Sequence, residues 1–487
     1  MQICDFDTIT VNMGEQDRTY LYRAVSGRIA GLIDEGVLRP GERVPSVRRT
    51  STLEGVSVST TLQAYMLLES RGYIEARPQS GFYVRSRQAA LPPEPRTSVP
   101  GRQAHRVGVS GLMSKLLQAA SDPDVVPLGA ACPSPELLPG PRLNRILAGL
   151  IRRSGSRING YDFAPGNPEL RRQVARRSLD WGGRLAPEDI MITSGATEAL
   201  HLSLGAVTSP GDVVAVESPA YFGILLQLEA LGLKALEIPC HPQQGLRLDV
   251  LADALRKHRV RACVASPNFS NPLGSAMSDD AKRELVDMLG RRGIPLIEDD
   301  LYGDIHFGGA RPKAAKAFDR EGLVLLLSSF SKLIAPGYRI GWLSAGRFQA
   351  RVETLKLTST LATPSMLQMV IAQYLESGAY DRHLRRMRAA FGLQIEQMTA
   401  AVGEHFPAGT RVTRPRGGFV LWVELPQCVD SLELLDRALA EGISISPGPM
   451  FSARQRFRNY IRLNCGYPWS PRLDQAIRTL GRLAAGY

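Results

Sequence analysis

The sequence predicts an α/β protein made of two units that a proline-rich segment joins. Residues 111–487 alternate helical patterns with short apolar runs, which is typical of a mostly parallel sheet buried on both faces. Residues 20–85 instead have the pattern of three helices followed by two short strands. At 487 residues the chain is longer than one hydrophobic core supports, so two or more domains are expected.

The N-terminal unit begins with an amphipathic helix over residues 20–35, in which apolar side chains recur at helical spacing. A second helix opens with Ser46 as its N-cap, and a third helix follows a short turn that ends at Ser57. Strands at 72–76 and 81–84 then form a hairpin. This order of elements predicts a winged helix-turn-helix, a unit that places its third helix in the major groove of DNA.

This stretch resembles the DNA-binding domain of the GntR family over about Tyr20 to Arg85. The resemblance rests on an ordered set of matches, Gly41-x-Arg43-Val44-Pro45-Ser46-x-Arg48, Val56-Ser57-x-x-Thr60, Ala64-Tyr65, Leu68, Gly72-Tyr73-Ile74 and Ser80-Gly81-Phe82-Tyr83-Val84. It implies DNA contacts from a set of small and basic residues, with the glycine in the wing: Arg43, Ser46, Arg48, Ser57, Ser59, Thr60 and Gly81.

The third helix departs from the family pattern in one respect. Val58 and Leu62 stand at positions where the family often has arginine, so bidentate reading of guanine is not expected there. Contacts to phosphates and thymine methyl groups are the alternative. A helix-turn-helix that serves only protein contacts also stays open.

Composition places the domain boundaries. We assign residues 14–87 to the winged helix-turn-helix, 88–112 to a linker and 113–487 to the second domain. The linker contains the runs 91–95 and 99–102, which are rich in proline and polar residues. Such a segment is expected to be semi-extended and without a core, so that the two domains can move relative to one another.

A single lysine follows the apolar run 322–327, which has the pattern of a buried strand. An unpaired ammonium is costly to bury, so Lys332 is a poor core residue. A lysine whose pKa is lowered by burial and a neighbouring cation is instead a good nucleophile for Schiff-base chemistry. Ser329, Ser331 and Arg339 lie beside it and could form a cup for a phosphate. A surface lysine in a polar loop is the plainer interpretation.

Polar or aromatic residues follow three other predicted strands, and parallel sheets bind ligands at the carboxyl ends of their strands. The strand at 191–193 leads into Gly195-Ala196-Thr197, which could bind an anion at a helix N-terminus or merely begin the helix. Tyr221 could cover an aromatic ring or simply pack. Asn271 lies in a turn and could donate a hydrogen bond to a ring oxygen.

Three consecutive acids, Glu298, Asp299 and Asp300, end a fourth strand and are followed by Tyr302. A carboxylate at the end of a buried strand is costly unless a cation pairs with it, and a protonated pyridine nitrogen is such a cation. Two of the three acids could instead belong to a solvated loop.

Together these groups are the parts needed to hold pyridoxal 5′-phosphate. Asp299 would keep the ring nitrogen protonated, so that negative charge at a substrate's α-carbon can spread into the ring. Lys332 would then move the α-proton.

Residues 113–487 resemble the fold type I aminotransferases of class I/II, through Ser329-x-x-Lys332 with Arg339, Asp299-x-x-Tyr302 and Asn271-Pro272-x-Gly274. The resemblance implies Lys332, Asp299 and Tyr302 as catalytic residues and Arg462 as the clamp for a substrate α-carboxylate. It also implies that Tyr161 reaches the phosphate of a neighbouring subunit. The implied cofactor contacts are Gly195, Ala196, Thr197, Tyr221, Asn271, Asp299, Tyr302, Ser329, Ser331, Lys332, Arg339 and Tyr161.

The net charge of +12 suits a polyanionic partner, and ten arginines face only three acids between residues 142 and 184, a local net charge of +7. These arginines could extend a DNA-binding surface or be ordinary solvated helix faces. Six scattered cysteines without CxxC or CxxxH spacing indicate a reducing compartment and no metal site. With no signal peptide and no apolar run that could span a bilayer, a cytoplasmic protein without a membrane partner is expected.

A GntR-type winged helix joined to an aminotransferase-like domain resembles the MocR subfamily of transcription regulators. The resemblance implies a homodimer that binds a double-stranded DNA operator, with the winged helix of one chain against the large domain of the other. Occupancy of Lys332 by the cofactor and an amino acid or amine effector would alter DNA binding. One alternative is a working aminotransferase with an accessory DNA-binding domain. A sensor of the cofactor alone is disfavoured, because it would not need Arg462.

Overall fold

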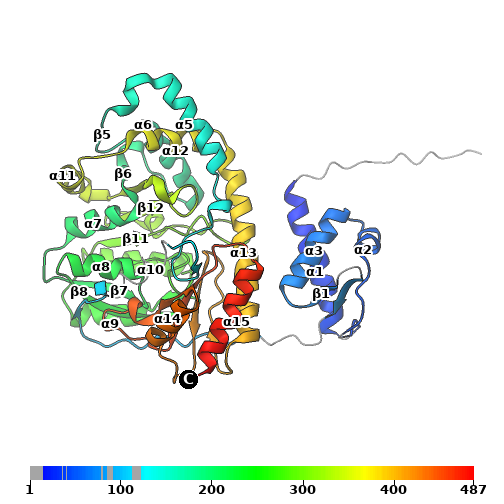
Figure 1. Cartoon of the computed structure of the whole chain (residues 1–487). Coiled ribbons are helices and arrows are strands. Elements are labelled where there is room, and N and C mark those ends of the chain that lie inside the picture. Colours follow the sequence, from blue (N-terminus) through cyan, green and yellow to red (C-terminus); the bar gives the residue numbers. More distant parts are fainter. Residues whose placement is uncertain (1–14, 36, 40, 78–79, 85–90, 112–121) are drawn as a thin grey trace, which may run out of the picture. The chain divides into compact units, whose positions relative to one another are not determined.

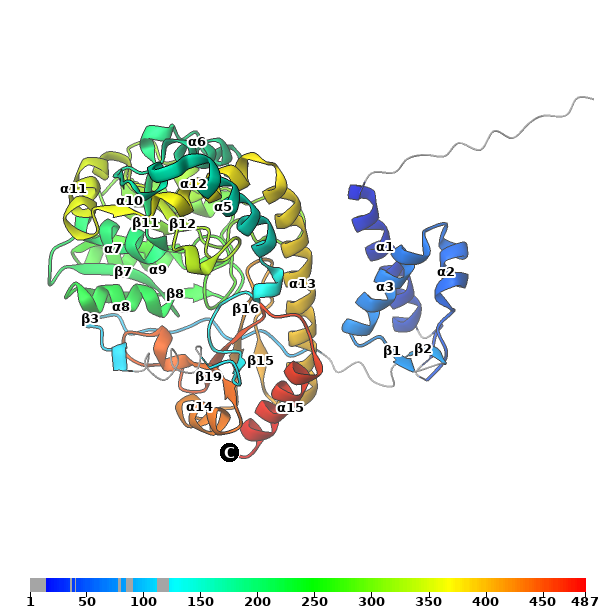
Figure 2. The ribbon, with the colours of Figure 1, turned by 45° about the horizontal axis from the view of Figure 1, so that its top comes forward.

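The computed structural model describes residues 15–35, 37–39, 41–77, 80–84, 91–111 and 122–487. The chain divides into two compact units, residues 1–91 and 92–487, drawn in two orientations in Figures 1 and 2. In these described ranges no helix is both long enough and apolar enough to cross a membrane. Nor do they contain a group of three or more His, Cys, Asp or Glu side chains placed to hold a metal ion.

The small unit consists of three helices and a hairpin, which confirms the predicted order of elements. They are α1 (Glu15–Asp34), α2 (Val47–Glu54), α3 (Val58–Ser70), β1 (Ile74–Arg77) and β2 (Gly81–Val84). Serine hydroxyls cap the N-termini of α2 and α3. Ser46 Oγ accepts a hydrogen bond from the Arg49 N–H at 3.3 Å, and Ser57 Oγ accepts one from the Thr60 N–H at 3.1 Å. Each serine therefore satisfies a donor that the helix leaves free.

Tyr65 on α3 holds the small unit together. Its hydroxyl donates to the carbonyl of Pro45 at 2.5 Å and lies 2.7 Å from Thr50 Oγ1 on α2. Its ring meets Phe82 of β2 edge to face, with 5.1 Å between the ring centroids. One buried side chain thus joins the turn before α2, α2 itself and the hairpin.

The large unit is built on a mixed sheet of nine strands. Its strand order is β3-β8-β7-β10-β11-β12-β13-β6, with β9 beside β8. The strands are β3 (His105–Arg106), β6 (Met191–Thr193), β7 (Val213–Ser218), β8 (Lys234–His241), β9 (Gly245–Leu246), β10 (Val260–Ala265), β11 (Leu296–Asp299), β12 (Val324–Ser329) and β13 (Gly341–Ser344). The five neighbours from β8 to β12 run parallel. Because β13 is antiparallel to both β12 and β6, β6 runs in the same direction as β12.

Helices surround this sheet, some packed directly on its strands and others on neighbouring helices (Figure 1). They are α5 (Gly140–Ser154), α6 (Pro168–Arg177), α7 (Gly195–Val207), α8 (Phe222–Ala230), α9 (Leu248–Lys257), α10 (Asp279–Gly290), α11 (Gln349–Ser359) and α12 (Ser365–Glu376). The central strands are buried almost throughout, which explains why they read as continuous apolar runs in the sequence.

The long helix α13 (Ala379–His405) leads into a smaller C-terminal subdomain. That subdomain packs α14 (Ser431–Ala440) and α15 (Pro471–Ala485) around a four-stranded antiparallel sheet with its own apolar core. The sheet consists of β15 (Arg411–Val412), β16 (Val420–Glu424), β18 (Ser446–Pro447) and β19 (Tyr460–Asn464). Two short pairs complete the fold, β4 (Val126–Pro127) with β17 (Ile443–Ser444) and β5 (Asp162–Phe163) with β14 (Ala362–Thr363).

Much of the expected linker is packed on the large unit instead of being free of a core. The Val412 N–H donates to the Pro93 carbonyl at 2.8 Å, and Ser98 Oγ donates to the Ser218 carbonyl at 2.5 Å. Further along, β3 pairs with β8. A proline-rich segment has no repeating apolar pattern that would signal packing, but its free carbonyls readily accept hydrogen bonds from a neighbouring surface. Residues 88–90 and 112 of the expected linker lie outside the described part of the chain.

Candidate functional site

The residues singled out in the large unit lie where strands that run in one direction end. The strands β6, β7, β10, β11 and β12 finish at the same edge of the sheet. The residues that follow them include Gly195, Tyr221, Asn271, Tyr302 and Lys332. Parallel strands therefore bring together side chains that are more than a hundred residues apart.

Arg339 lies at the centre of a candidate anion-binding cup at this edge. Its guanidinium donates to Ser331 Oγ at 3.3 Å and to the Ser194 carbonyl at 3.4 Å. The Ser331 N–H in turn donates to Ser329 Oγ at 3.2 Å. Gly195 has a φ of +80°, which favours glycine, and a Cβ built there would lie 2.6 Å from Arg339 Nη2 and would displace the guanidinium from the start of α7. No side chain caps that helix, and backbone N–H groups at a helix N-terminus favour an anion.

Lys332 lies beside this cup, in a half-buried position. Its Nζ donates to the Ala131 carbonyl at 2.6 Å. Burial lowers the pKa of the Lys332 ammonium, and the cations Arg462 and Arg339 lower it further. A lysine that more readily becomes a neutral amine is the chemical requirement for a nucleophile.

Asp299 is the acid that remains available to a ligand. Burial raises the pKa of its carboxyl to about 7, although the Leu301 N–H donates to Oδ1 at 3.2 Å and favours the charged form. A cation placed against this carboxyl would restore its charge.

The two flanking acids have different tasks, and the interpretation of them as a solvated loop is wrong. Glu298 is fully buried and accepts hydrogen bonds from the N–H groups of Ala315 at 2.6 Å and Lys316 at 2.8 Å. Asp300, also buried, pairs with Arg311 at 2.5 Å and accepts from Asn268 at 2.9 Å. Alternation along the strand sends neighbouring side chains to opposite faces, so each acid meets different partners.

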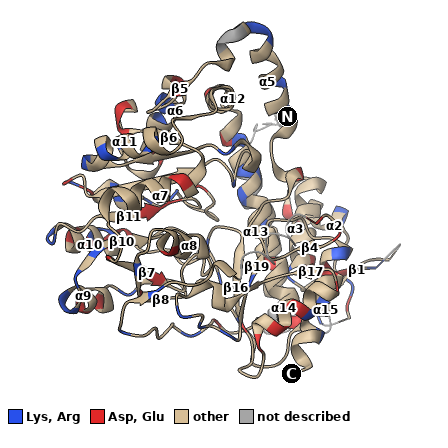
Figure 3. Cartoon of the chain, turned by 60° about the vertical axis from the view of Figure 1, so that its left-hand side comes forward, with Lys and Arg blue, Asp and Glu red and all other residues tan. Residues whose placement is uncertain are grey.

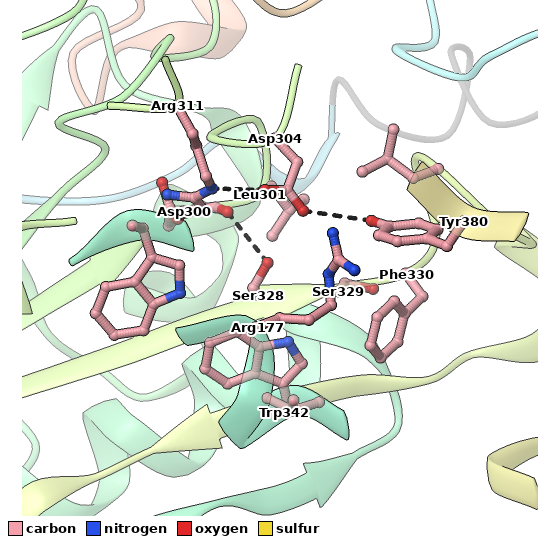
Figure 4. A pocket seen from close by; sticks show the side chains of 13 residues that line it. Arg177, Asp300, Leu301, Asp304, Arg311, Ser328, Ser329, Phe330, Trp342 and Tyr380 are labelled. Atoms are coloured by element: carbon pink, nitrogen blue, oxygen red, sulfur yellow. Dashed lines mark hydrogen bonds and ion pairs between the residues drawn. The ribbon is translucent and has the colours of Figure 1, made fainter. Parts of the chain in front are cut away.

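Arg311 belongs to an ionic network that surrounds a cavity of about 40 Å³ (Figure 4). It bridges Asp300 and Asp304, each at 2.5 Å, and the Tyr380 hydroxyl donates to Asp304 at 3.3 Å. Burial alone would raise the pKa of Asp304, but Arg311 holds it below its ordinary value. Ser329 contributes to the wall of this cavity as well as to the cup, so the network supports the ends of β11 and β12.

Arg462 on β19 is completely buried. It donates to Asn271 Oδ1 at 3.2 Å, to Ser446 Oγ at 3.0 Å and to the carbonyl of Gly129. Among the described residues its Nε has no hydrogen-bond partner. The rings of Phe222 and Phe451 lie 5.6 and 5.3 Å from the guanidinium carbon. A buried planar cation with a free donor is suited to a carboxylate ligand.

Two tyrosines complete this part of the site. Tyr302 is buried and meets Phe419 edge to face at 5.4 Å, and burial raises the pKa of its hydroxyl. Tyr221 lies half-buried, with its ring 4.7 Å from that of Phe222. The charge of Arg462 opposes the effect of burial on the pKa of both hydroxyls.

Sequence reasoning missed the backbone of Gly129 to Cys132 and the buried acid Glu217. The carbonyls of Gly129 and Ala131 accept hydrogen bonds from Arg462 and Lys332. Glu217 accepts from the Ser266 N–H at 3.2 Å, and burial raises its pKa to about 8, with Asp299 adding to the effect. Backbone carbonyls have no sequence signature beyond the small residues that let them approach, here Gly129, Ala130 and Ala131.

Tyr161 and the remaining cup residues are more exposed. Tyr161 is 71% exposed, and its ring stacks on that of Phe163 with 5.2 Å between the centroids. Ala196 is half-buried and Thr197 is exposed in the first turn of α7.

The residues expected to face DNA divide into two groups. Arg48 and Ser59 are exposed, and Arg43 lies along the hairpin, where its guanidinium would be 3.2 Å from a Cβ on Gly81. Thr60 differs from the expectation, because it is only 4% exposed and its hydroxyl lies 2.7 Å from Ser57 Oγ. Its side chain supports the start of α3 from inside.

The arginine-rich stretch also divides. Arg172 and Arg177 form ion pairs with Glu169 and Asp381 at 2.8 and 2.9 Å. Four arginines on α5 instead line a groove of about 330 Å³, and basic positions are visible at the C-terminal end of that helix in Figure 3. They are Arg142, Arg145, Arg152 and Arg153. Part of the cluster is therefore structural, and part remains available to an anion.

Pyridoxal 5′-phosphate fits the residues that are present. The cup built by Arg339 and kept open by Gly195 suits its phosphate, and Asp299 offers a half-buried carboxyl to its ring nitrogen. Lys332 offers an amine of lowered pKa to its aldehyde. The free Nε of Arg462 leaves a donor for the carboxylate of an amino compound.

Two families match the chain. Residues 21–84 match the bacterial regulatory proteins of the gntR family, and residues 138–479 match the aminotransferases of class I and II.

Relatives of full length support the same assignment. The chain is 40% identical to the uncharacterised HTH-type transcriptional regulator YdcR of Escherichia coli, over 95% of this chain and 98% of the relative. It is 29% identical to the HTH-type transcriptional regulator TauR of Rhodobacter capsulatus, over 90% of this chain and 91% of the relative. The α-aminoadipate aminotransferase LysN of Thermus thermophilus, solved with N-(5′-phosphopyridoxyl)-L-leucine, superimposes with a TM-score of 0.72 at 30% identity, over 78% of this chain and 96% of that one. The chain belongs to the GntR-type transcription regulators of the MocR subfamily, in which a helix-turn-helix is joined to an aminotransferase domain that uses pyridoxal 5′-phosphate.

Proposed function

We propose that this regulator acts as a homodimer, binds a specific DNA operator through α3 and the hairpin, and changes its operator affinity when an amino compound binds at Lys332. The observation that carries this proposal is the complete set of cofactor and carboxylate groups in a chain whose other unit is a helix-turn-helix. A sensor of the cofactor alone would not need the fully buried Arg462 with its free Nε.

The effector is an amino compound with an α-carboxylate. Arg462 would bind the carboxylate, with Asn271 fixing the plane of the guanidinium. Asp299 would hold a proton on the ring nitrogen, and Lys332 Nζ would exchange protons with the α-carbon. The cofactor, when bound, supplies an electron sink for charge that develops at that carbon.

The segment after residue 91 offers a route from the cofactor to the DNA-binding unit. Ser98 donates to the carbonyl of Ser218, the last residue of β7, and Tyr221 follows three positions later. A ligand that moves the Tyr221 loop would therefore disturb the attachment of this segment. The effect on DNA requires the ligand to bind two arrangements of the chain with different affinities.

The exposed ring of Tyr161 supports a dimer. A large aromatic side chain at 71% exposure, stacked on Phe163 at 54% exposure, is costly to leave in water. In a homodimer it would be covered at the cup of the neighbouring subunit and would complete that phosphate site.

The test is to measure operator affinity and cofactor absorbance on the same full-length protein. DNA from upstream of its own coding sequence is titrated by fluorescence anisotropy at fixed salt, with and without a panel of amino acids. We expect at least one amino acid to change both the visible spectrum and the operator affinity, the latter about 5- to 150-fold. Arg462→Lys, which keeps the charge but loses the planar fork, should remove this response and retain operator binding without effector.

Two results would contradict regulation by an effector. One is an operator affinity that no amino acid changes. The other is multiple turnover between amino acids and 2-oxo acids with no effect on DNA, which would make the chain a working aminotransferase with an accessory domain. The intact set of Lys332, Asp299 and Arg462 keeps that second function chemically possible.

A further inference from the structure

The outward face of α3 is apolar. Val58, Leu62 and Met66 recur every four residues and are 51, 43 and 58% exposed. The opposite face, with Ala64, Tyr65 and Leu68, is buried in the small core. Leucine and methionine so exposed on one side of a short helix are not needed for folding of this unit.

This face also lacks the side chains that read guanine. The helix contains no Lys or Arg, and its single charged residue, Glu69, accepts a hydrogen bond from the Ala76 N–H at 2.8 Å near the C-terminal end. Ser59 Oγ lies 2.8 Å from Ser57 Oγ, within the cap. Thr60 and Thr61 are buried, so Gln63 is the remaining exposed polar side chain in the first turns. Glutamine pairs with the edge of adenine, and apolar side chains contact the methyl group of thymine.

We propose that α3 recognises A·T-rich half-sites chiefly through the 5-methyl groups of thymine, with Gln63 on an adjacent adenine. This inference rests on the proposed function, because it concerns the same DNA-binding face. Successive apolar side chains are about 6 Å apart along the helix, close to the rise of two base pairs. The surrounding charge fits DNA, because Arg43, Arg48 and Arg49 are exposed on the hairpin side and on α2, which packs against α3.

The direct test replaces thymine by deoxyuridine in the operator, which removes the methyl group and keeps base pairing. The operator is first located by footprinting full-length protein on its own upstream DNA. We expect affinity to fall about fourfold for each contacted methyl group that is removed. Binding to a non-specific duplex should not change when its thymines are replaced. Unchanged affinity for the uracil operator would overturn the inference and leave the proposed function intact, whereas absence of any specific site would overturn both.

A paired substitution identifies the side chain responsible. Leu62→Ala should weaken binding to the thymine operator about as much as loss of a methyl contact, and should have no further effect on the uracil operator. Leu53→Ala is the matched control, since Leu53 is an apolar residue of α2 that is 70% exposed. Equal losses for Leu62→Ala on both operators would contradict a methyl contact. A changed oligomeric state with unchanged DNA affinity would show instead that a second protein covers this face.

A gain of function provides the last check. Val58→Arg should shift the preferred base pair at one position of each half-site from A·T to G·C by about tenfold, because arginine binds the guanine edge. The shift in base preference is measured by selecting bound sequences from a random duplex library and comparing those of the variant with those of the wild type. A library preference rich in G·C for the wild type would overturn the inference.

Discussion

The cofactor site and the DNA-facing surface differ in how strongly their surroundings fix each side chain. In the cofactor site Arg462 is completely buried and donates to Asn271, Ser446 and a backbone carbonyl. On α3 the side chains of Val58 and Leu62 are about half exposed and contact little of the small unit. A buried charge is stable only when it has hydrogen-bond or ionic partners, so the residues of the cofactor site constrain one another. On the solvent-exposed face of α3 almost any side chain is tolerated, because water can solvate it.

The difference is visible in residues of the same chemical type. Ser329 and Ser331 are buried and linked to each other and to Arg339, where they form part of the cup. Ser46 and Ser57 are exposed, and each is already engaged as the N-cap of a helix. A serine in the buried site can be assigned by its neighbours, while a serine on the DNA face has a structural task that is independent of DNA.

The largest effect should come from Lys332→Ala. Removing the amine eliminates the covalent attachment of the cofactor, so the visible absorbance band of the lysine-bound form should be lost completely. Non-specific DNA binding should remain, because that binding depends on phosphate contacts of the other unit.

Lys313→Ala is the control, since the Lys313 side chain is 48% exposed and pairs with Asp279 at 3.1 Å. It should leave the spectrum unchanged. If Lys332→Ala lost non-specific DNA binding as well as the visible absorbance band, the cofactor site and the DNA-binding unit would not function independently.

The next largest effect is expected for Arg311→Met. This change leaves the buried Asp300 and the partly buried Asp304 without their shared cation, which should lower the free energy of unfolding by about 3–5 kcal/mol. Urea unfolding of the large unit measures the effect. Arg172→Met, which breaks an ion pair whose arginine side chain is 63% exposed, should cost less than about 1 kcal/mol. Similar losses of unfolding free energy in Arg311→Met and Arg172→Met would mean that burial does not make the first ion pair more important for stability than the second.

Asp299 should make the stability of the cofactor-free protein depend on pH. Its pKa is about 7 in the folded chain and close to 4 in an unfolded one. Between these values the folded state holds more protons, so the free energy of unfolding falls as pH rises through the interval. Glu217, with a pKa of about 8, acts in the same direction.

Asp299→Asn removes this titration. The variant should match the wild type near pH 4 and be more stable near pH 8, as measured by urea unfolding across that range. Adding cofactor should reduce the difference in unfolding free energy between the variant and the wild type at pH 8, because a cation at the ring nitrogen favours the ionised carboxyl. A stability difference that stays constant with pH would contradict a raised pKa of Asp299 in the folded, cofactor-free protein.

Sequence reasoning placed the polar residues of the cofactor site at strand ends because buried parallel strands leave a strong apolar pattern. In the structure Asp299 ends such a strand, and Lys332 and Asn271 follow two others. Sequence reasoning could not place the carbonyls of Gly129 and Ala131, which contribute through backbone geometry alone. It also misjudged Glu298 and Asp300, because the partners that make their burial tolerable lie on distant loops.

In the helix-turn-helix unit the sequence pattern predicts the helices and strands, but it does not predict the role of each side chain. Ser46 and Ser57 were identifiable as caps from residue type and position. The burial of Thr60 depends on how α3 packs against the rest of the small unit, and no local signal reports it. The folded position of residues 92–111 was likewise hidden, since their partners are surface groups of the large unit.

The smallest effect, and the one that separates a cap from a DNA contact, is expected for Ser57. Ser57→Ala removes the hydroxyl that accepts the Thr60 N–H, which should lower the stability of the small unit by about 1 kcal/mol without DNA. Ser57→Asp should restore stability because aspartate also caps, yet it should weaken DNA binding because it adds negative charge beside phosphates. Ser59→Ala, at an exposed position in the first turn, is the neutral comparison for stability. If Ser57→Asp bound DNA as well as the wild type, Ser57 would be a cap only, and the DNA-facing set would reduce to the exposed arginines and the apolar face of α3.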